Sequence, residues 1–392
     1  MPSDVLSMWK AGLRKDLRSL EERNLCRTLA EIQGINFCSN DYLGLAENPA
    51  LRQSLVESVG HASRVGGTGS RLLSGQTEDW RELEERFAEF AGTEAALFFS
   101  TGYSANLGLL ASLVGKDDVI YSDELNHASL IDGMRLSGAR KVIYPHLDLK
   151  ALELALRQDS GAPWRRVIVT ESVFSMDGDL APLRQIADIA EKYGAAVIVD
   201  EAHAIGVHGP AGRGLAAAAG IAGQVLASVH TCGKALGSAG AFVCGPRVLK
   251  DYLVNHARTF VFSTALPPYF ARQIGSALDI AVTMDQERQE LLRRAARLTE
   301  QLRAAGFKTA GSASQIGPVV LGNVAETLDA ADYLQRDGFA VRAIRPPTVP
   351  DGRARLRLSL TSKIPEAELK RLLKSLISWR FLRASAVVAK RA

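Results

Sequence analysis

Short apolar runs rich in β-branched residues alternate with helical patterns between residues 96 and 245. The runs are ALFFS (96–100), VIYSD (119–123), KVIYP (141–145), RVIVTES (166–172), AAVIVDEA (195–202), VLASVH (225–230) and GAFVCG (240–245). Between two of them, the segment 180–194 has the apolar spacing of an amphipathic helix and ends on a glycine. This alternation predicts βαβ units in an α/β fold, with a mostly parallel, doubly wound sheet.

The pattern changes after residue 282. A long charged helical segment, 284–306, leads to short strand-like runs near 317–322, 339–344 and 354–360 and then to an amphipathic terminal helix. We therefore predict a large domain at 41–282 and a smaller C-terminal α+β domain at 283–392. An N-terminal helical segment at 1–40 precedes them and could add to the smaller domain.

Composition excludes several classes of function. The chain has 392 residues, a formal net charge of +4 and 23% charged residues, as expected of a globular protein. The basic C-terminal region is read as a solvated face, since a nucleic-acid surface would need a stronger basic patch with interleaved aromatic residues. No apolar run reaches the roughly 18 residues of a membrane span. The four cysteines have no CxxC spacing and no secretory signal before them. We expect a cytoplasmic protein without nucleic-acid, membrane or metal partners.

The tetrad DEAH at 200–203 also occurs in one class of nucleic-acid helicase. Such a motor needs an upstream loop of the form GxxxxGK[ST] to hold nucleotide phosphates. The Gly-Lys pairs of this chain, 115–116 and 233–234, lack a glycine at the required position, and the second follows the tetrad. The tetrad therefore serves other chemistry at the end of a buried strand.

Three predicted strand ends carry groups that suit one cofactor. Asp200 ends an apolar strand, and Lys234 follows the next strand in a turn flanked by glycines. Thr101, Gly102 and Tyr103 form a strand-to-helix turn whose free N–H groups suit a phosphate. Each feature alone could be structural, as a strand-end cap or a loop lysine. Together, an acid, an amine and a phosphate site at one edge of a sheet predict pyridoxal phosphate (PLP) with its Schiff base on Lys234.

The ordered motifs of the chain resemble those of the α-oxoamine synthase family of fold-type I PLP enzymes. They are NFCSNDYLGLA (36–46), GGTGSRLLSG (66–75), STGYSANLGLL (100–110), DELNHASLIDG (123–133), VTESVFSMDGDLAPL (169–183), VDEAHAIGVHGPAGRG (199–214), HTCGKALGSAGAFV (230–243), FSTALPP (262–268) and AIRPPTVPDGRARLRLSLT (343–361). The resemblance spans nearly the whole chain. It implies a PLP-dependent transferase of type I and a homodimer with shared active sites.

The resemblance also implies roles for residues around the cofactor. Lys234 would form the Schiff base, Asp200 would pair with the pyridine nitrogen, and His127 would stack on the ring. His203 and Ser175 would lie near the ring oxygen. The implied phosphate contacts are Gly102, Tyr103 and Thr231, with Ser263 and Thr264 supplied by the neighbouring subunit. The implied catalytic residues are Lys234, His127, Asp200 and His203. His127 could instead simply cap the helix that follows it.

The implied activity is a PLP-dependent acyl transfer in biotin biosynthesis. It is the decarboxylative condensation of L-alanine with a pimeloyl thioester, carried by coenzyme A or acyl carrier protein. The implied substrate contacts are Arg27, Asn40, His127, Arg345 and Thr348. Arg345 offers a planar fork suited to the alanine carboxylate, although it could instead pair with an acid between the domains. The alternatives are a sister synthase that condenses glycine with a short acyl-CoA and a PLP-binding regulatory protein without turnover.

Overall fold

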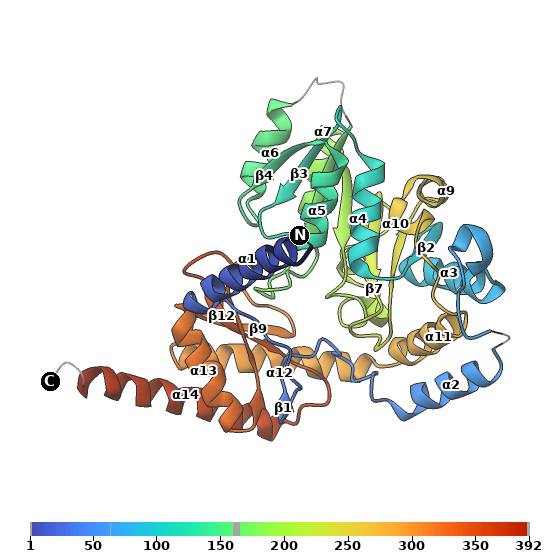
Figure 1. The fold of residues 1–392 in the computed structure, drawn as a ribbon. Helices are drawn as coiled ribbons and strands as arrows, with labels where there is room; N and C mark the ends of the chain where they lie inside the picture. Colours follow the sequence, from blue (N-terminus) through green and yellow to red (C-terminus); the bar gives the residue numbers. More distant parts are fainter. Residues whose placement is uncertain (1, 63, 160–164, 390–392) are drawn as a thin grey trace.

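The computed structural model describes residues 2–62, 64–159 and 165–389. A seven-stranded sheet forms the centre of the large domain (Figure 1), in the order β2-β8-β7-β6-β5-β3-β4. The strands are β2 (Ala95–Phe99), β3 (Val119–Asp123), β4 (Arg140–Tyr144), β5 (Arg166–Glu171), β6 (Ala196–Asp200), β7 (Ala227–Thr231) and β8 (Ala241–Gly245). The strand β8 pairs antiparallel with both β2 and β7, and the pairs β6-β7, β5-β6, β3-β5 and β3-β4 of this sheet are parallel. The predicted mostly parallel sheet is confirmed, and the carboxyl ends of β3, β5, β6 and β7 meet at one edge.

Helices cover both faces of this sheet, as a doubly wound fold requires. One face packs against α4 (Gly102–Leu113), α5 (Ala128–Ser137), α9 (Arg247–His256) and α10 (Arg258–Val261). The other face packs against α6 (Leu149–Gln158), α7 (Leu183–Tyr193) and the short α8 (Leu215–Ala218). Both faces of the parallel strands are therefore buried, which explains why these strands are apolar throughout rather than alternating.

The C-terminal region has its own antiparallel sheet, in the order β11-β12-β9. Its strands are β9 (Ile316–Gly322), β11 (Arg342–Ile344) and β12 (Ala354–Ser359), and its helices are α12 (Asp285–Ala304), α13 (Val324–Arg336) and α14 (Glu366–Ala389). The short β1 (Ile35–Asn36) pairs in parallel with β10 (Phe339–Ala340). The chain before the large domain is therefore joined to the C-terminal region. The boundaries at 40 and 282 stay a prediction.

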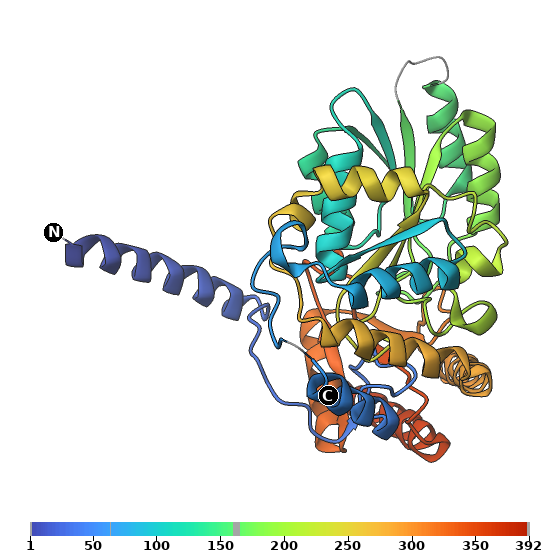
Figure 2. The same cartoon turned by 90° about the vertical axis from the view of Figure 1, so that its right-hand side faces the viewer.

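Helix α1 (Pro2–Glu22) projects away from the rest of the chain (Figure 2). Its large apolar side chains, which include Trp9, Leu13 and Leu17, are exposed. Three further helices, α2 (Pro49–Gly60), α3 (Glu78–Ala91) and α11 (Tyr269–Val282), pack on one another near the β2 edge of the sheet. Among the described residues, no helix has the length and apolarity to cross a membrane.

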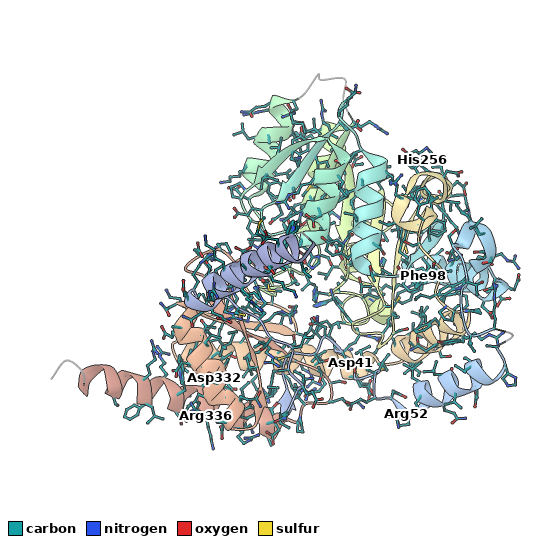
Figure 3. The ribbon with its side chains drawn as sticks, viewed as in Figure 1. Asp41, Arg52, Phe98, His256, Asp332 and Arg336 are labelled. Atoms are coloured by element: carbon teal, nitrogen blue, oxygen red, sulfur yellow. The ribbon has the colours of Figure 1, made fainter. Side chains whose placement is uncertain are left out.

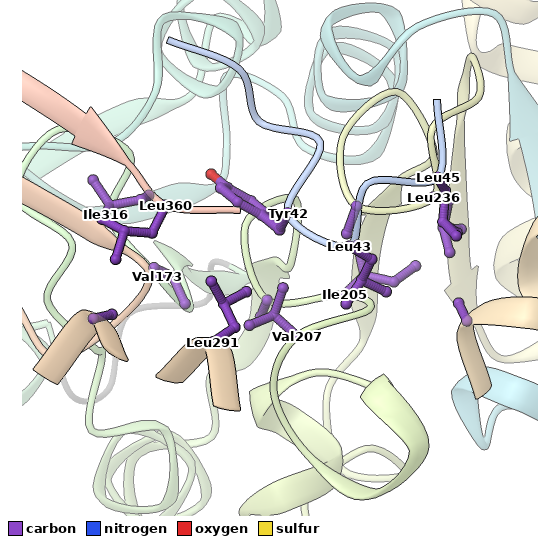
Figure 4. Packing of buried hydrophobic residues seen from close by; sticks show 14 of the residues in the cluster. Tyr42, Leu43, Leu45, Val173, Ile205, Val207, Leu236, Leu291, Ile316 and Leu360 are labelled. Carbon is purple, nitrogen blue, oxygen red and sulfur yellow. The ribbon is translucent and has the colours of Figure 1, made fainter. Parts of the chain in front are cut away.

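A continuous apolar cluster joins the strand-end loops to the C-terminal region (Figure 4). Ile205 and Leu236, each close in sequence to a predicted site residue, pack with Leu43, Leu291 and Ile316 in this cluster. Polar side chains such as Asp332 and Arg336 lie on the outer surface of α13 (Figure 3). The cluster holds the loops at the carboxyl edge of the sheet in fixed positions, because close-packed interiors resist displacement.

Candidate active site

Lys234 lies in a tight turn directly after β7. The N–H of Gly237 donates to the carbonyl of Lys234 at 2.9 Å. Gly237 has a φ of +53°, and a Cβ on it would lie 2.5 Å from the Ala46 nitrogen, so the turn requires glycine there. The turn brings the Lys234 amine to 2.9 Å from Nε2 of His203. Two residues that were each predicted to lie around the cofactor are therefore in contact.

The surroundings of Lys234 lower its pKa to about 8. Burial is the main cause, because it disfavours the charged amine. The negative charges of Asp200 and Glu171 oppose this effect, whereas the positive charge of Arg357 adds to it. An amine with this pKa is partly neutral near neutral pH, and a general base must be neutral to accept a proton.

His203 connects Lys234 to a chain of hydrogen bonds. Its Nδ1 lies 2.6 Å from the Tyr42 hydroxyl, which donates to Oδ1 of Asn40 at 3.1 Å. The same Asn40 oxygen accepts a hydrogen bond from Nη1 of Arg357 at 3.0 Å. Burial, aided by the charge of Lys234, holds the pKa of His203 well below its ordinary value. His203 is therefore neutral, and the chain links the lysine amine to a guanidinium.

The two carboxylates of the DEAH tetrad have different partners. Asp200 accepts hydrogen bonds from the N–H of Ala202 at 2.9 Å and from Nδ2 of Asn106 at 2.7 Å. Since a carboxylate has about four lone-pair positions, Asp200 keeps room for a further donor such as a pyridine N–H. Glu201 is fully buried and accepts from the first two N–H groups of α8. One carboxylate thus faces a site, and the other holds a helix in place.

The predicted phosphate residues meet at the start of α4. Thr101 caps this helix through its side chain, which accepts from the N–H of Ser104. A Cβ on Gly102 would lie 2.6 Å from Oγ1 of Thr231, so Gly102 and Thr231 are in close contact. Within the described part of the chain, no hydrogen bond uses the N–H of Gly102 or Tyr103. Free first-turn N–H groups at a helix N-terminus suit a phosphate.

The predicted substrate residues fall into two groups. Asn40 belongs to the hydrogen-bonded chain around Lys234, whereas Arg27 and Thr348 lie together, with Nη2 of Arg27 at 3.4 Å from the Thr348 hydroxyl. Arg345 lies in this second group, and its guanidinium donates to the backbone carbonyls of Asn24 and Cys26. The alternative of an ion pair with an acid between the domains is not seen among the described residues. Arg345 is thus joined to the N-terminal segment rather than to the chain around Lys234.

The guanidinium in that chain belongs to Arg357, which we did not single out from the sequence. Arg357 is buried on β12, and its Nε donates to the carbonyl of Ser175 at 2.6 Å. The available signal was the strand sequence ARLRLS (354–359), which has arginines at alternate positions among apolar residues. Arginine is seldom buried without a partner or a function. Tyr42 and Asn106 were missed as well, because the chain alone does not show which loops reach the strand ends.

Two further predicted site residues, Ser175 and Thr264, lie in different parts of the structure. Ser175 is buried, and its N–H donates to Oε2 of Glu171 at 3.2 Å, beside the end of β6. Thr264 is exposed and forms a bridge with Ser70, so the segments 66–75 and 262–268 pack on each other. No contact among the described residues joins Thr264 to Lys234. The predicted role of Thr264 in a neighbouring subunit's site stays a prediction.

The whole chain resembles known PLP-dependent proteins. The sequence profile of the family described as aminotransferase class I and II matches residues 32–376. The chain belongs to this family. The 8-amino-7-oxononanoate synthase of Geobacter sulfurreducens is 44% identical over 371 residues, which cover 94% of each chain.

Solved structures agree with this membership. That of 8-amino-7-oxononanoate synthase from Francisella tularensis has a TM-score of 0.78 at 30% identity and covers 90% of this chain and 99% of that chain. A high-resolution structure of SPT with PLP has a TM-score of 0.86 at 29% identity and covers 94% of this chain and 96% of that chain. The predicted family resemblance and the transferase fold are confirmed.

The residues at the sheet edge fit the cofactor of this family. Asp200 has a lone pair available for a ring N–H, Lys234 has an amine of lowered pKa, and α4 has free N–H groups. In addition, Oε1 of Glu171 and Oδ1 of Asn106 are buried and have no hydrogen-bond partner among the residues that the structure describes. Buried polar atoms without partners are rare in native proteins and are concentrated at functional sites. Family membership and the PLP-bound neighbour support PLP as the cofactor.

Proposed function

We propose that this chain is a PLP-dependent acyltransferase of biotin biosynthesis. It condenses L-alanine with a pimeloyl thioester and forms 8-amino-7-oxononanoate, carbon dioxide and the free thiol carrier. The observation that carries this proposal is the convergence of Lys234, His203 and Asp200 at one sheet edge, in a chain that matches 8-amino-7-oxononanoate synthases over almost its full length. We also propose a cytoplasmic homodimer with shared sites, on the family resemblance.

Proton transfer at the alanine Cα is the role we assign to Lys234. When bound, PLP supplies an electron sink for the bond that breaks at this carbon. Once its amine is free, Lys234 removes the Cα proton, since its lowered pKa leaves it partly neutral near neutral pH. Asp200 holds a proton at the ring nitrogen, and His203 keeps Lys234 oriented by accepting at Nε2.

We assign the alanine carboxylate to Arg357 instead of Arg345. Arg357 lies in the chain of hydrogen bonds that reaches Lys234, and its charge acts on that amine. Its Nε and Nη1 donate to Ser175, Asn40 and Ser359, so Nη2 is the nitrogen that can bind and orient a carboxylate through charge-assisted hydrogen bonds. Asn40, which already accepts from Arg357, completes this side of the site.

The second group of substrate residues suits the far end of the acyl chain. Burial and the nearby charge of Arg27 lower the pKa of Arg345, so two guanidinium groups lie close together. Like charges in proximity are unfavourable unless an anion joins them. Since the pimeloyl group ends in a carboxylate, we propose that Arg27, Arg345 and Thr348 bind that end.

The assay that tests the function compares substrates in the wild-type enzyme. L-Alanine is offered with pimeloyl-CoA and with pimeloyl-acyl carrier protein, and glycine is offered with acetyl-CoA. Turnover of alanine with either pimeloyl donor supports the proposal. Turnover of glycine with the short donor alone would identify the sister synthase instead. Bound PLP without turnover of any pair would point to the regulatory protein.

Lys234→Ala tests the assigned base. We expect a folded protein that has lost turnover by several orders of magnitude, because the covalent anchor and the base are the same amine. Mass spectrometry after borohydride reduction measures which lysine holds PLP in the wild-type enzyme. Label on a lysine other than Lys234 contradicts the assignment.

A further inference from the structure

Four polar side chains form a continuous chain of hydrogen bonds beside Lys234. They are Asp200, Asn106, Ser129 and His127. Nδ2 of Asn106 lies 2.7 Å from Oδ2 of Asp200 and 2.9 Å from the hydroxyl of Ser129. That hydroxyl lies 2.8 Å from Nδ1 of His127. Asn106 is 2% exposed and Ser129 is 1% exposed, so no bulk water competes for these bonds. The chain runs from the proposed partner of the pyridine nitrogen to the histidine predicted to stack on the ring.

The donor of each hydrogen bond in this series can be assigned one after another, starting from Asp200. An ionised carboxylate only accepts, so the Asn106 atom beside Asp200 must be the amide nitrogen. The second hydrogen of that nitrogen goes to the Ser129 oxygen, which leaves Oδ1 of Asn106 buried without a partner in the described part of the chain. Because the Ser129 oxygen accepts from Asn106, its own hydrogen is free to point to Nδ1 of His127. The orientation of one amide therefore sets the orientation of the hydroxyl.

The backbone agrees with this assignment. His127 is the N-cap residue of α5, and its Nδ1 also accepts from the N–H of Ser129 at 3.2 Å. Two donors converge on Nδ1, so this nitrogen carries no proton and the neutral ring has its hydrogen on Nε2. The positive end of the α5 dipole disfavours a charged imidazole at this position. His127 is exposed in the single chain, yet desolvation by nearby protein atoms lowers its pKa.

We propose that Asn106 and Ser129 are positioning residues that hold His127 neutral with its proton on Nε2. His127 then acts as a hydrogen-bond donor to a substrate oxygen and not as a base. A donor fixed in advance stabilises the negative charge that develops on a carbonyl oxygen during acyl transfer. This inference rests on the proposed function and on the predicted role of His127 as a substrate contact.

The test reads the tautomer directly. Holoenzyme labelled with ¹⁵N-histidine, without substrate, is studied by long-range ¹H–¹⁵N NMR, and a His127→Gln spectrum identifies the His127 signals. We expect a protonated Nε2 and an unprotonated Nδ1 in the wild-type enzyme. A proton on Nδ1 would overturn the proposal. Since no turnover is needed, this result stands apart from the assay of alanine and pimeloyl-CoA, whose failure would overturn the proposed function instead.

Ser129→Ala tests the hydroxyl. A donor on Nδ1 favours the neutral ring, so its loss should raise the pKa of His127 and move the acid limb of the kcat/KM profile to higher pH. We expect kcat/KM for the acyl donor to fall about tenfold, as for the loss of one net hydrogen bond. Ser129→Thr keeps the hydroxyl and should restore both values.

Asn106→Leu tests the amide that orients this hydroxyl. The substitution frees the Ser129 hydroxyl to turn away from Nδ1 of His127, so it should shift the pH profile in the same direction as Ser129→Ala.

Ser137→Ala is the matched control. It removes a hydroxyl at the other end of α5, where the group donates to the carbonyl of Met134. It should leave the His127 signals and the pH profile unchanged. The proposal is contradicted if the pKa of His127 is the same in Ser129→Ala, in Asn106→Leu and in the wild-type enzyme. In that case the hydrogen bonds through Asn106 and Ser129 do not position the ring.

Discussion

At the scale of single residues, substitutions of Arg357 and Arg345 test which of the two arginines binds the alanine carboxylate. Arg357→Lys keeps the charge beside Lys234 but removes the fork, so we expect the alanine KM to rise and kcat to fall together, because the Cα–H loses its orientation. Arg345→Lys should leave the alanine KM unchanged and raise the KM of pimeloyl-CoA. Steady-state kinetics with each substrate varied in turn measure the split. The reverse pattern would return the alanine carboxylate to Arg345.

Individual residues of the site also show which parts of a site can be predicted from the sequence. Asp200 and Lys234 were predictable, because Asp200 ends one buried strand, Lys234 follows the next, and parallel strands end at one edge. Arg357 was not, because its role depends on how β12 lies against the loop that carries Ser175. A contact between residues so far apart in the chain has no local signal. Asn106 was missed for a similar reason, since its partners come from β6 and α5.

At the scale of secondary-structure elements, His146 joins three segments of the large domain. Its Nδ1 lies 2.8 Å from Asp123 at the end of β3, and its Nε2 lies 2.8 Å from Asp179 before α7. Burial lowers the pKa of His146, but the two carboxylates outweigh this effect and raise the pKa to about 10. The charged imidazole therefore stabilises the folded state fully below its unfolded pKa of roughly 6.5, and this contribution is lost as the pH rises toward about 10.

His146→Gln should accordingly lower the free energy of unfolding most at acidic to neutral pH. We expect the difference from the wild-type protein to shrink steadily between pH 7 and about 10. Urea unfolding followed by circular dichroism at several pH values measures this difference. A difference that is constant with pH would mean that His146 is not charged in the folded protein.

Elements of the large domain were predictable to within a few residues for a physical reason. Strands buried on both faces are uninterrupted apolar runs with polar ends, so β3, β5 and β6 stand out in the chain. The antiparallel direction of β8 and the pairing of β1 with β10 have no such signature. Both depend on the path of the chain in space, which local patterns do not record.

For the whole molecule, the proposed dimer can be tested through an exposed apolar side chain. Leu73 lies in the segment 66–75, which packs on the segment that contains Thr264, and its side chain is 84% exposed. If a partner subunit covers this segment, Leu73→Asp should give a monomer with little activity, since burying an unpaired charge is costly. Val248→Asp is the control, because Val248 is 73% exposed on α9, outside both segments. Analytical ultracentrifugation and the alanine assay measure the two effects. A Leu73→Asp protein that stays dimeric and active refutes the placement of this segment in a dimer interface.

The parallel pairing of β1 with β10 gives this chain a particular order of assembly during synthesis. Residues 35–36 leave the ribosome long before their strand partners at 339–340. The large domain between them can fold as a unit in the meantime, because its sheet uses only strands from its own stretch of chain. Until β10 has emerged, the segment that carries β1 has no folded C-terminal region to join. A stop codon placed before β10 should therefore release a folded large domain with an unpaired N-terminal strand, which would be prone to aggregate.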